Sequence, residues 1–144
     1  MGIWSGKIVG WSMSARMTAE LADGAPGTAI VGRRPPGGCI HHGDHGSRYV
    51  SLLLGKTMRE AGVRPSMGSI VSPWDNAAME SLMGPVEAGC VHARTFETRD
   101  QAALEMFDYI ECSCNRARIH SALGHLSPEE FEARHMEGAV KMAA

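Results

Sequence analysis

Two carboxylates at a defined spacing are the residues of this sequence best suited to metal-assisted chemistry. Asp44 lies in the polar segment His41–Tyr49 and Glu80 lies in the polar segment Asp75–Ser81, with thirty-five residues between the two acids. Carboxylate oxygens are preferred ligands of hard divalent cations such as Mg²⁺. Asn76 precedes Glu80 by four positions, so on a helix both side chains share one face. Asp44 and Glu80 are therefore candidate metal ligands.

Simpler roles compete with metal binding by these residues. Asp44 taken alone is typical of a loop carboxylate that caps the following helix, and Glu80 taken alone is typical of an exposed helix position. The histidines His41, His42 and His45 add a third interpretation, because His-x-Asp-His resembles part of a metallo-β-lactamase-type zinc motif. The upstream half of that motif is imperfect here, and its remaining ligands are not evident in the sequence.

The elements that must position the two acids are predicted to alternate between strands and helices. Short β-branched or aromatic runs predict strands at Lys7–Met13, Cys39–His42 and Val63–Met67. Asp44 would then follow the end of a strand, where open α/β sheets place their ligand sites. The sequence as a whole predicts the α/β class.

Helices are predicted from capping residues and from apolar residues at helical spacing. A helix beginning near Arg16 is expected to break early, at Gly24, Pro26 and Gly27. The other predicted helices are Tyr49–Ala61 with Gly62 as its stop, a helix from Ser72-Pro73 to Gly84-Pro85, a helix from Thr98 to about Asn115, and a short helix from Ser127 to about His135.

Length and charge limit the classes of partner. The 144 residues suit one domain, and with 44% hydrophobic and 21% charged residues the chain can bury a core. The formal net charge of -2 argues at first against an acidic partner such as DNA. However, residues 1–70 carry a net charge of +4 and residues 71–144 a net charge of -6, so a polyanion could meet the first half of the chain.

Other features indicate a cytoplasmic protein without a membrane partner. No apolar run approaches the roughly 20 residues of a membrane span, and Met1–Gly10 lacks the zones of a signal peptide. The irregularly spaced cysteines are expected to be free structural thiols; they are Cys39, Cys90, Cys112 and Cys114.

Several segments, in order, resemble the integrase catalytic core of bacterial insertion-sequence transposases. These are the orfB-type members of the retroviral integrase superfamily, known as the DDE type. The matching segments are Lys7–Met13, His41–Ser51, Ser66-Met67, Asp75–Ser81, Tyr109–Gly124, Leu126-Ser127-Pro128 and Phe131-Glu132. The two acids and their spacing fall inside this resemblance, which covers nearly the whole chain.

The resemblance implies an RNase H-like fold, incomplete at its N-terminal strands, and a role in DNA transposition and integration. In this family three carboxylates bind two Mg²⁺ or Mn²⁺ ions for in-line attack on a DNA phosphodiester. Asp44 would be the second acid and Glu80 the third, so both would be catalytic and metal-binding residues. The partners implied are transposon ends and target DNA, in the bacterial nucleoid. Candidate DNA contacts implied by the resemblance are Arg48, Tyr49, Asn76, Arg116, Arg118 and His120.

The sequence also departs from the family pattern. The first acid of the family lies upstream of the segment resembling Lys7–Met13, and we expect this chain to begin after it. Glu87 inverts a charge expected near DNA, and Pro85 is expected to end its helix. We therefore expect impaired catalysis. The alternative is a non-catalytic remnant that binds DNA or co-assembles with an intact transposase. We expect a partial integrase core over residues 1–136 and a C-terminal tail over residues 137–144.

Overall fold

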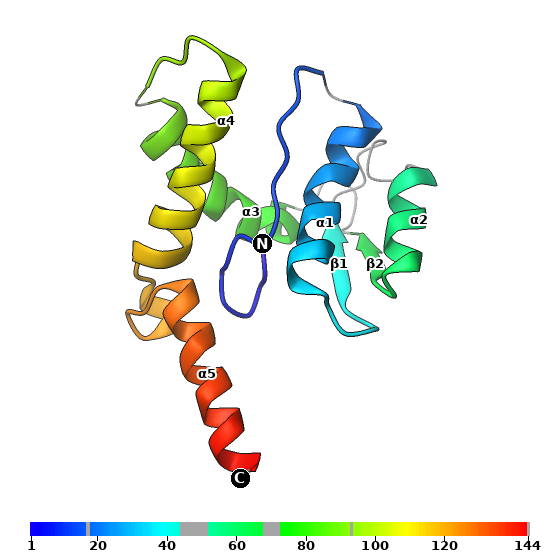
Figure 1. Cartoon of the computed structure of the whole chain (residues 1–144), viewed down its shortest axis with the longest axis vertical. Helices are drawn as coiled ribbons and strands as arrows, with labels where there is room; N and C mark the ends of the chain where they lie inside the picture. Colours follow the sequence, from blue (N-terminus) through cyan, green and yellow to red (C-terminus); the bar gives the residue numbers. More distant parts are fainter. Residues whose placement is uncertain (17, 44–51, 68–72, 93, 144) are drawn as a thin grey trace. The chain divides into compact units, whose positions relative to one another are not determined.

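The computed structural model describes residues 1–16, 18–43, 52–67, 73–92 and 94–143 (Figure 1). Asp44, Arg48, Tyr49 and His45 lie outside these ranges. The chain forms two compact units: Val9–Ser81, called here the strand unit, and Met1–Ile8 together with Leu82–Ala144, called here the helical unit. Among the described helices, none is both long enough and apolar enough to cross a membrane.

The strand unit is built around a β-α-β sequence. Strand β1 (Ile40–Gly43) pairs in parallel with strand β2 (Arg64–Met67), and helix α2 (Leu52–Glu60) lies between them in the chain. Helix α2 buries Leu54 and Met58, which are four residues apart and so share one face. Together with Val63 they form a core against which Ile30 and Ala61 pack.

Most predicted elements of this unit are confirmed. The strands at Cys39–His42 and Val63–Met67 correspond to β1 and β2 within one residue at each end. The helix predicted at Tyr49–Ala61 is α2 over its described part, and the helix stops at Gly62, whose φ of 66° suits glycine.

The early break predicted in the first helix is wrong. Helix α1 runs without interruption from Ala19 to Arg33, through Pro26. Proline inside a helix costs about 3 kcal/mol, because it removes one backbone hydrogen bond and crowds the preceding turn. Pro26 is buried. The hydroxyl of Thr28 donates to the carbonyl of Gly24 at 2.8 Å and satisfies an acceptor in the same turns.

Helix α3 (Pro73–Val86) begins as predicted at Pro73, but it does not end at Gly84-Pro85. It continues through Pro85, and a π-helical turn, η1 (Glu87–Val91), follows directly. The backbone N–H of His92 donates to the carbonyl of Glu87 at 2.7 Å, the five-residue step of a π-helix. The Tyr109 hydroxyl donates to the Pro85 carbonyl at 3.0 Å, a tertiary contact that no local propensity predicts.

The C-terminal helices begin where the capping signals place them. The Thr98 hydroxyl accepts from the Gln101 N–H at 3.1 Å at the start of α4 (Arg99–Asp108). At α5 (Pro128–Ala143), the Ser127 N–H and hydroxyl both donate to Glu130, at 2.9 and 3.0 Å, and they hold the pKa of Glu130 below its usual value. Between these helices lie the π-helix η2 (Tyr109–Ala117) and a 3-10 turn, η3 (Ser121–Leu123). Helix α5 extends beyond the predicted end at His135.

The strand predicted at Lys7–Met13 is wrong. These residues are extended but carry no sheet pairing. The side chain of Asn115 occupies both backbone hydrogen-bonding groups of Ile8, where a neighbouring strand would otherwise pair. Tertiary contact has therefore overridden the β propensity of this segment.

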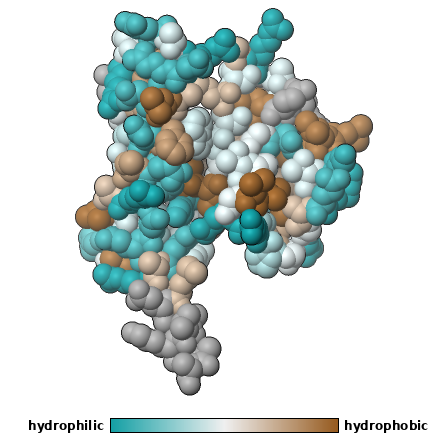
Figure 2. All heavy atoms as spheres, viewed as in Figure 1, coloured by the Kyte–Doolittle hydropathy of each residue, from teal (hydrophilic) through white to brown (hydrophobic). Residues whose placement is uncertain are grey.

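Surface and thiols follow ordinary rules of burial. Figure 2 shows hydrophobic residues at the surface among larger hydrophilic areas. The most exposed large hydrophobic residues include Leu52 at 91%, Ile3 at 77% and Val31 at 77%.

All four cysteines carry free thiols, as predicted, and Cys90 and Cys114 are buried. Burial raises the pKa of the Cys114 thiol, which favours its neutral form.

Gly10 is required where the extended segment approaches α1. A Cβ at Gly10 would lie 2.7 Å from the backbone nitrogen of Ala29 and 3.0 Å from its Cβ. We expect Gly10→Ala to lower the free energy of unfolding by about 1–3 kcal/mol through overpacking. The control is Gly27→Ala in α1, where a Cβ meets nothing within 4 Å and alanine should stabilise the helix slightly. Urea unfolding of both variants measures the difference, and equal stabilities would contradict the close approach.

Candidate functional site

Glu80, one of the two candidate metal ligands, lies on a helix, as predicted. Glu80 is an exposed residue of α3, one turn beyond Asn76. Strand β1 ends at Gly43, the residue directly before Asp44 in the sequence. Because β1 and β2 are parallel, their carboxyl ends share one edge of the sheet, where ligand sites of such sheets occur. The assignment of Asp44 and Glu80 as metal ligands stays a prediction.

The histidines on β1 make local contacts. Nδ1 of His42 lies 3.1 Å from the Ser66 hydroxyl of β2, and these two residues are partners in the register of the parallel pair. His41 is half-buried, and burial lowers its pKa. Within the described ranges, no three His, Cys, Asp or Glu side chains gather in a way that could hold a metal ion.

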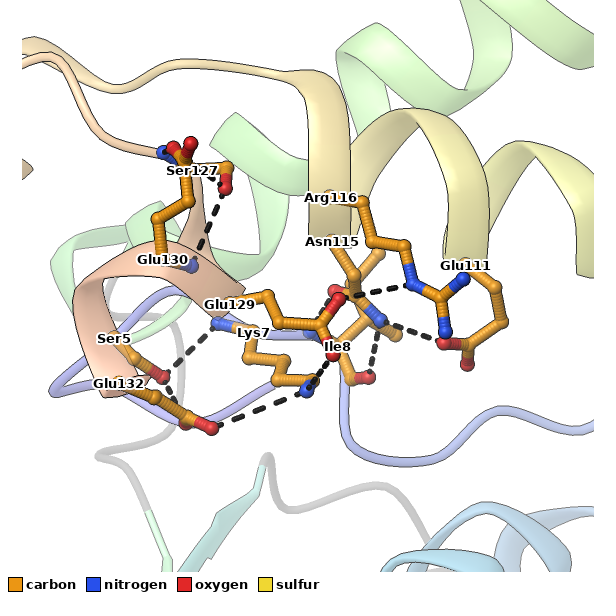
Figure 3. A network of polar contacts seen from close by, with 10 residues as sticks. All are labelled: Ser5, Lys7, Ile8, Glu111, Asn115, Arg116, Ser127, Glu129, Glu130 and Glu132. Carbon is orange, nitrogen blue, oxygen red and sulfur yellow. Dashed lines mark hydrogen bonds and ion pairs between the residues drawn. The ribbon is translucent and has the colours of Figure 1, made fainter. Parts of the chain in front are cut away.

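The C-terminal motif that resembles the family has Asn115 at its centre (Figure 3). Asn115 is 1% exposed and lies in η2. Its Oδ1 accepts from the N–H of Ile8 at 2.8 Å, and its Nδ2 donates to the carbonyl of Ile8 at 3.1 Å. The Glu111 carboxylate accepts a longer bond from the same Nδ2 at 3.4 Å. One carboxamide thus satisfies both polar backbone groups of a buried residue more than a hundred positions away in the sequence.

An ionic network joins the same segments of the helical unit (Figure 3). Lys7 lies 3.6 Å from Glu129 and 3.9 Å from Glu132, measured between the ammonium nitrogen and a carboxylate oxygen. The Ser5 hydroxyl donates to Glu132 at 2.7 Å, and Ser5 is 2% exposed. These contacts bind the first eight residues to α5.

The three predicted DNA contacts of this motif, Arg116, Arg118 and His120, differ in their surroundings. Arg116 donates to Glu129 at 2.9 Å, so its charge is partly matched within the protein. Arg118 is exposed. His120 is half-buried, and burial followed by the nearby charge of Arg118 lowers its pKa, so its ring is neutral at pH 7. Of the three, Arg118 has the most available positive charge.

Residues 120–126 form a tight loop after these side chains. The N–H of His120 donates to the carbonyl of Leu126 at 3.0 Å, and the N–H of His125 donates back to the carbonyl of His120 at 3.0 Å. Gly124 and His125 both have positive φ, at 68° and 61°. A histidine in this region is uncommon, and here the flanking backbone bonds hold it there.

The sequence did not reveal the contacts of Ser5, Ile8 and Glu132. Their partners are distant in the chain, and neither periodicity nor capping signals report on such pairs. The one chemical signal was Asn115 itself. If its carboxamide is buried in a helix it must find hydrogen-bond partners, because a buried unpaired polar group is costly.

Comparison with known proteins relates this chain to insertion-sequence transposases and their integrase core domain. Residues 80–136 match the integrase core domain family. The transposase InsF for insertion sequence IS3A from Escherichia coli (strain K12) is 39% identical over 134 residues, which are 93% of this chain and 46% of that protein. The transposase for insertion sequence element IS904 from Lactococcus lactis subsp. lactis (strain IL1403) is 41% identical over 130 residues, 90% of this chain and 51% of that protein. The chain spans about half the length of these curated relatives.

A solved structure gives the fold. A chain from the cryo-EM structure of the simian T-cell lymphotropic virus intasome in complex with PP2A regulatory subunit B56 gamma matches with a TM-score of 0.62 and 12% identity, over 82% of this chain and 41% of that one. The fold is therefore the RNase H-like integrase core, and the predicted α/β class is confirmed. Over most of its length the chain is similar to insertion-sequence transposases, and residues 80–136 match the integrase core domain.

Removing the Asn115 carboxamide should destabilise the helical unit. Asn115→Ala leaves the N–H and carbonyl of Ile8 without these partners, and we expect a loss of about 2–4 kcal/mol in the free energy of unfolding. The neighbouring Arg116→Ala removes an exposed ion pair with Glu129 and should cost less than about 1 kcal/mol. Chemical denaturation compares the two variants. An Asn115→Ala protein as stable as Arg116→Ala would show that water replaces the carboxamide without cost.

Proposed function

We propose that this chain acts in the transposition of an insertion element, by phosphodiester strand transfer on DNA. The proposal rests on one observation above all: Asp44 and Glu80 have thirty-five residues between them and lie in segments that resemble the family, in a chain similar to insertion-sequence transposases over most of its length. The full activity and its DNA partners are inferred from this similarity. DNA as substrate would place the protein at the bacterial nucleoid.

Asp44 and Glu80 fit the metal that this chemistry uses. Mg²⁺ and Mn²⁺ prefer oxygen ligands, and both candidate side chains are carboxylates. Glu80 is exposed on α3 and can turn toward a ligand without breaking a buried contact. When bound, such an ion supplies Lewis-acid stabilisation of the charge on the attacking and leaving oxygens of the phosphodiester. The two side chains would hold the ion; Arg48, Tyr49, Asn76 and Arg118 would orient the DNA backbone.

Binding of Mn²⁺ tests the assignment of the two acids. We expect weak binding by the parent chain, and we expect Asp44→Asn and Glu80→Gln each to lower the affinity about tenfold or more, because each removes one charged ligand. Glu60→Gln is the matched control, since Glu60 is an exposed helix carboxylate that pairs with Lys56. The free Mn²⁺ signal in electron paramagnetic resonance gives the affinities. Equal binding by all three variants would exclude Asp44 and Glu80 as the ligands.

The 144-residue polypeptide by itself should not join DNA ends at a measurable rate. By the proposed assignment, Asp44 and Glu80 supply two of the three acids of the family site, and a site that lacks a shared metal ligand should lose most of its rate. A strand-transfer assay with Mn²⁺ and a pre-cut transposon end measures this directly. Efficient joining by this polypeptide alone would overturn the expected impairment. Binding to DNA ends without joining, or inhibition of an added intact transposase, would favour the non-catalytic role.

A further inference from the structure

A cluster of arginines at one end of the strand unit has no role in the proposed carboxylate site. Arg33 is the last residue of α1, and Arg34 follows it. Arg59 lies in the last turn of α2, and Arg64 is the first residue of β2. All four side chains are exposed. These residues are called here the arginine surface.

Backbone hydrogen bonds bring the three segments together. The N–H of Gly38, in the loop after α1, donates to the carbonyl of Gly62, in the turn after α2, at 2.8 Å. The N–H of Arg64 donates to the carbonyl of Cys39 at 2.8 Å, and Arg64 is paired with Ile40 in the sheet register. Figure 1 shows the ends of α1 and α2 beside the starts of the two strands. The arginines therefore share one end of the unit.

This end is opposite the carboxylate edge of the sheet. The arginine surface lies at the amino ends of β1 and β2, whereas Asp44 follows the carboxyl end of β1. The acid closest in the sequence, Glu60, forms an ion pair with Lys56 at 3.9 Å. Within the described part of the chain, no carboxylate lies within ion-pair distance of Arg34 or Arg64. The positive charges of Arg34 and Arg64 therefore have no matching acid among the described residues.

Helix stability explains two of the four residues. Arg33 and Arg59 stand in the last turns of α1 and α2, where a cation compensates the negative end of the helix dipole. Arg34 and Arg64 lie outside these helices and need another reason. The loop that follows Arg34 is open around its backbone, because a Cβ at Gly37 or Gly38 would meet nothing within 4 Å. An extended polyanion could therefore approach the backbone closely here.

We infer that the arginine surface binds the phosphate backbone of duplex DNA, as a contact separate from the carboxylate site. Guanidinium groups match phosphate oxygens with two parallel hydrogen bonds, and a row of them neutralises successive phosphates without reading sequence. The inference rests on the proposed action on DNA, and it adds a second DNA segment or flank held at the opposite end of the strand unit. The excess positive charge of residues 1–70 supports it.

The test measures duplex binding by the full chain with Arg34→Ala and Arg64→Ala combined. Fluorescence anisotropy of a labelled duplex of arbitrary sequence, in EDTA and over a series of NaCl concentrations, gives the affinity and its salt slope. Loss of two phosphate contacts should lower the slope of log affinity against log salt by about two, and the affinity about tenfold at low salt.

A matched control separates this surface from the effect of net charge. The Arg16→Ala and Arg99→Ala pair also removes two exposed cations; Arg16 precedes α1, about 22 Å along the helix from Arg34, and Arg99 begins α4. We expect this pair to leave the slope within the error of the parent. Equal losses in both pairs, or no loss in the Arg34 and Arg64 pair, would overturn the inference. Because EDTA removes any divalent ion, this assay does not depend on the carboxylate site, and failure of the carboxylate assignment is recognised separately in the Mn²⁺-binding experiment.

Discussion

The arrangement of the helical unit depends on a single buried carboxamide. The Asn115 side chain bonds to the N–H and the carbonyl of Ile8, the two groups to which a neighbouring strand would otherwise bond. A buried N–H or carbonyl left without a partner costs about 1–3 kcal/mol, which is a large share of the stability of a small domain. The first eight residues can therefore remain beside η2 and α5 without forming a sheet. The buried Ser5 contact to α5 adds to this anchor, and so do the Lys7 ion pairs, which are more accessible to water.

The π-helical geometry of η2 serves the same contact. In a π-helix each hydrogen bond spans five residues, so side chains shift around the axis relative to an α-helix. The N–H of Arg118 donates to the carbonyl of Ser113 at 2.7 Å, which closes the π segment just after Asn115. Asn115 and Arg116 are neighbours in the chain but differ in exposure. Asn115 is buried, whereas Arg116 is exposed and paired with Glu129. One adjacent pair of motif residues therefore supplies both an internal anchor and a surface charge.

The strand unit separates opposite charges along its parallel strands. The carboxyl end of β1 leads into Asp44, and the amino ends of both strands lie beside exposed arginines. Such a separation limits direct neutralisation between acids and arginines. The net charge of -2 conceals this arrangement, because it sums over both ends. The acids lie in segments that resemble the transposase family, whereas the arginine surface arises from how three segments of the unit meet.

The sequence by itself determined several helix boundaries and the resemblance to the transposase family. Capping residues fixed the starts of α4 and α5, Pro73 marked the start of α3, and Gly62 marked the end of α2, because these signals act within one helical turn. Spacing and motif order indicated the integrase core and the two acids. Tertiary structure decided the rest: α1 continues through Pro26, which is buried, and the backbone groups of Ile8 bond to Asn115 rather than to a neighbouring strand. The contact between Asn115 and Ile8 joins segments far apart in the chain, and such contacts can outweigh local propensities of about 1–3 kcal/mol.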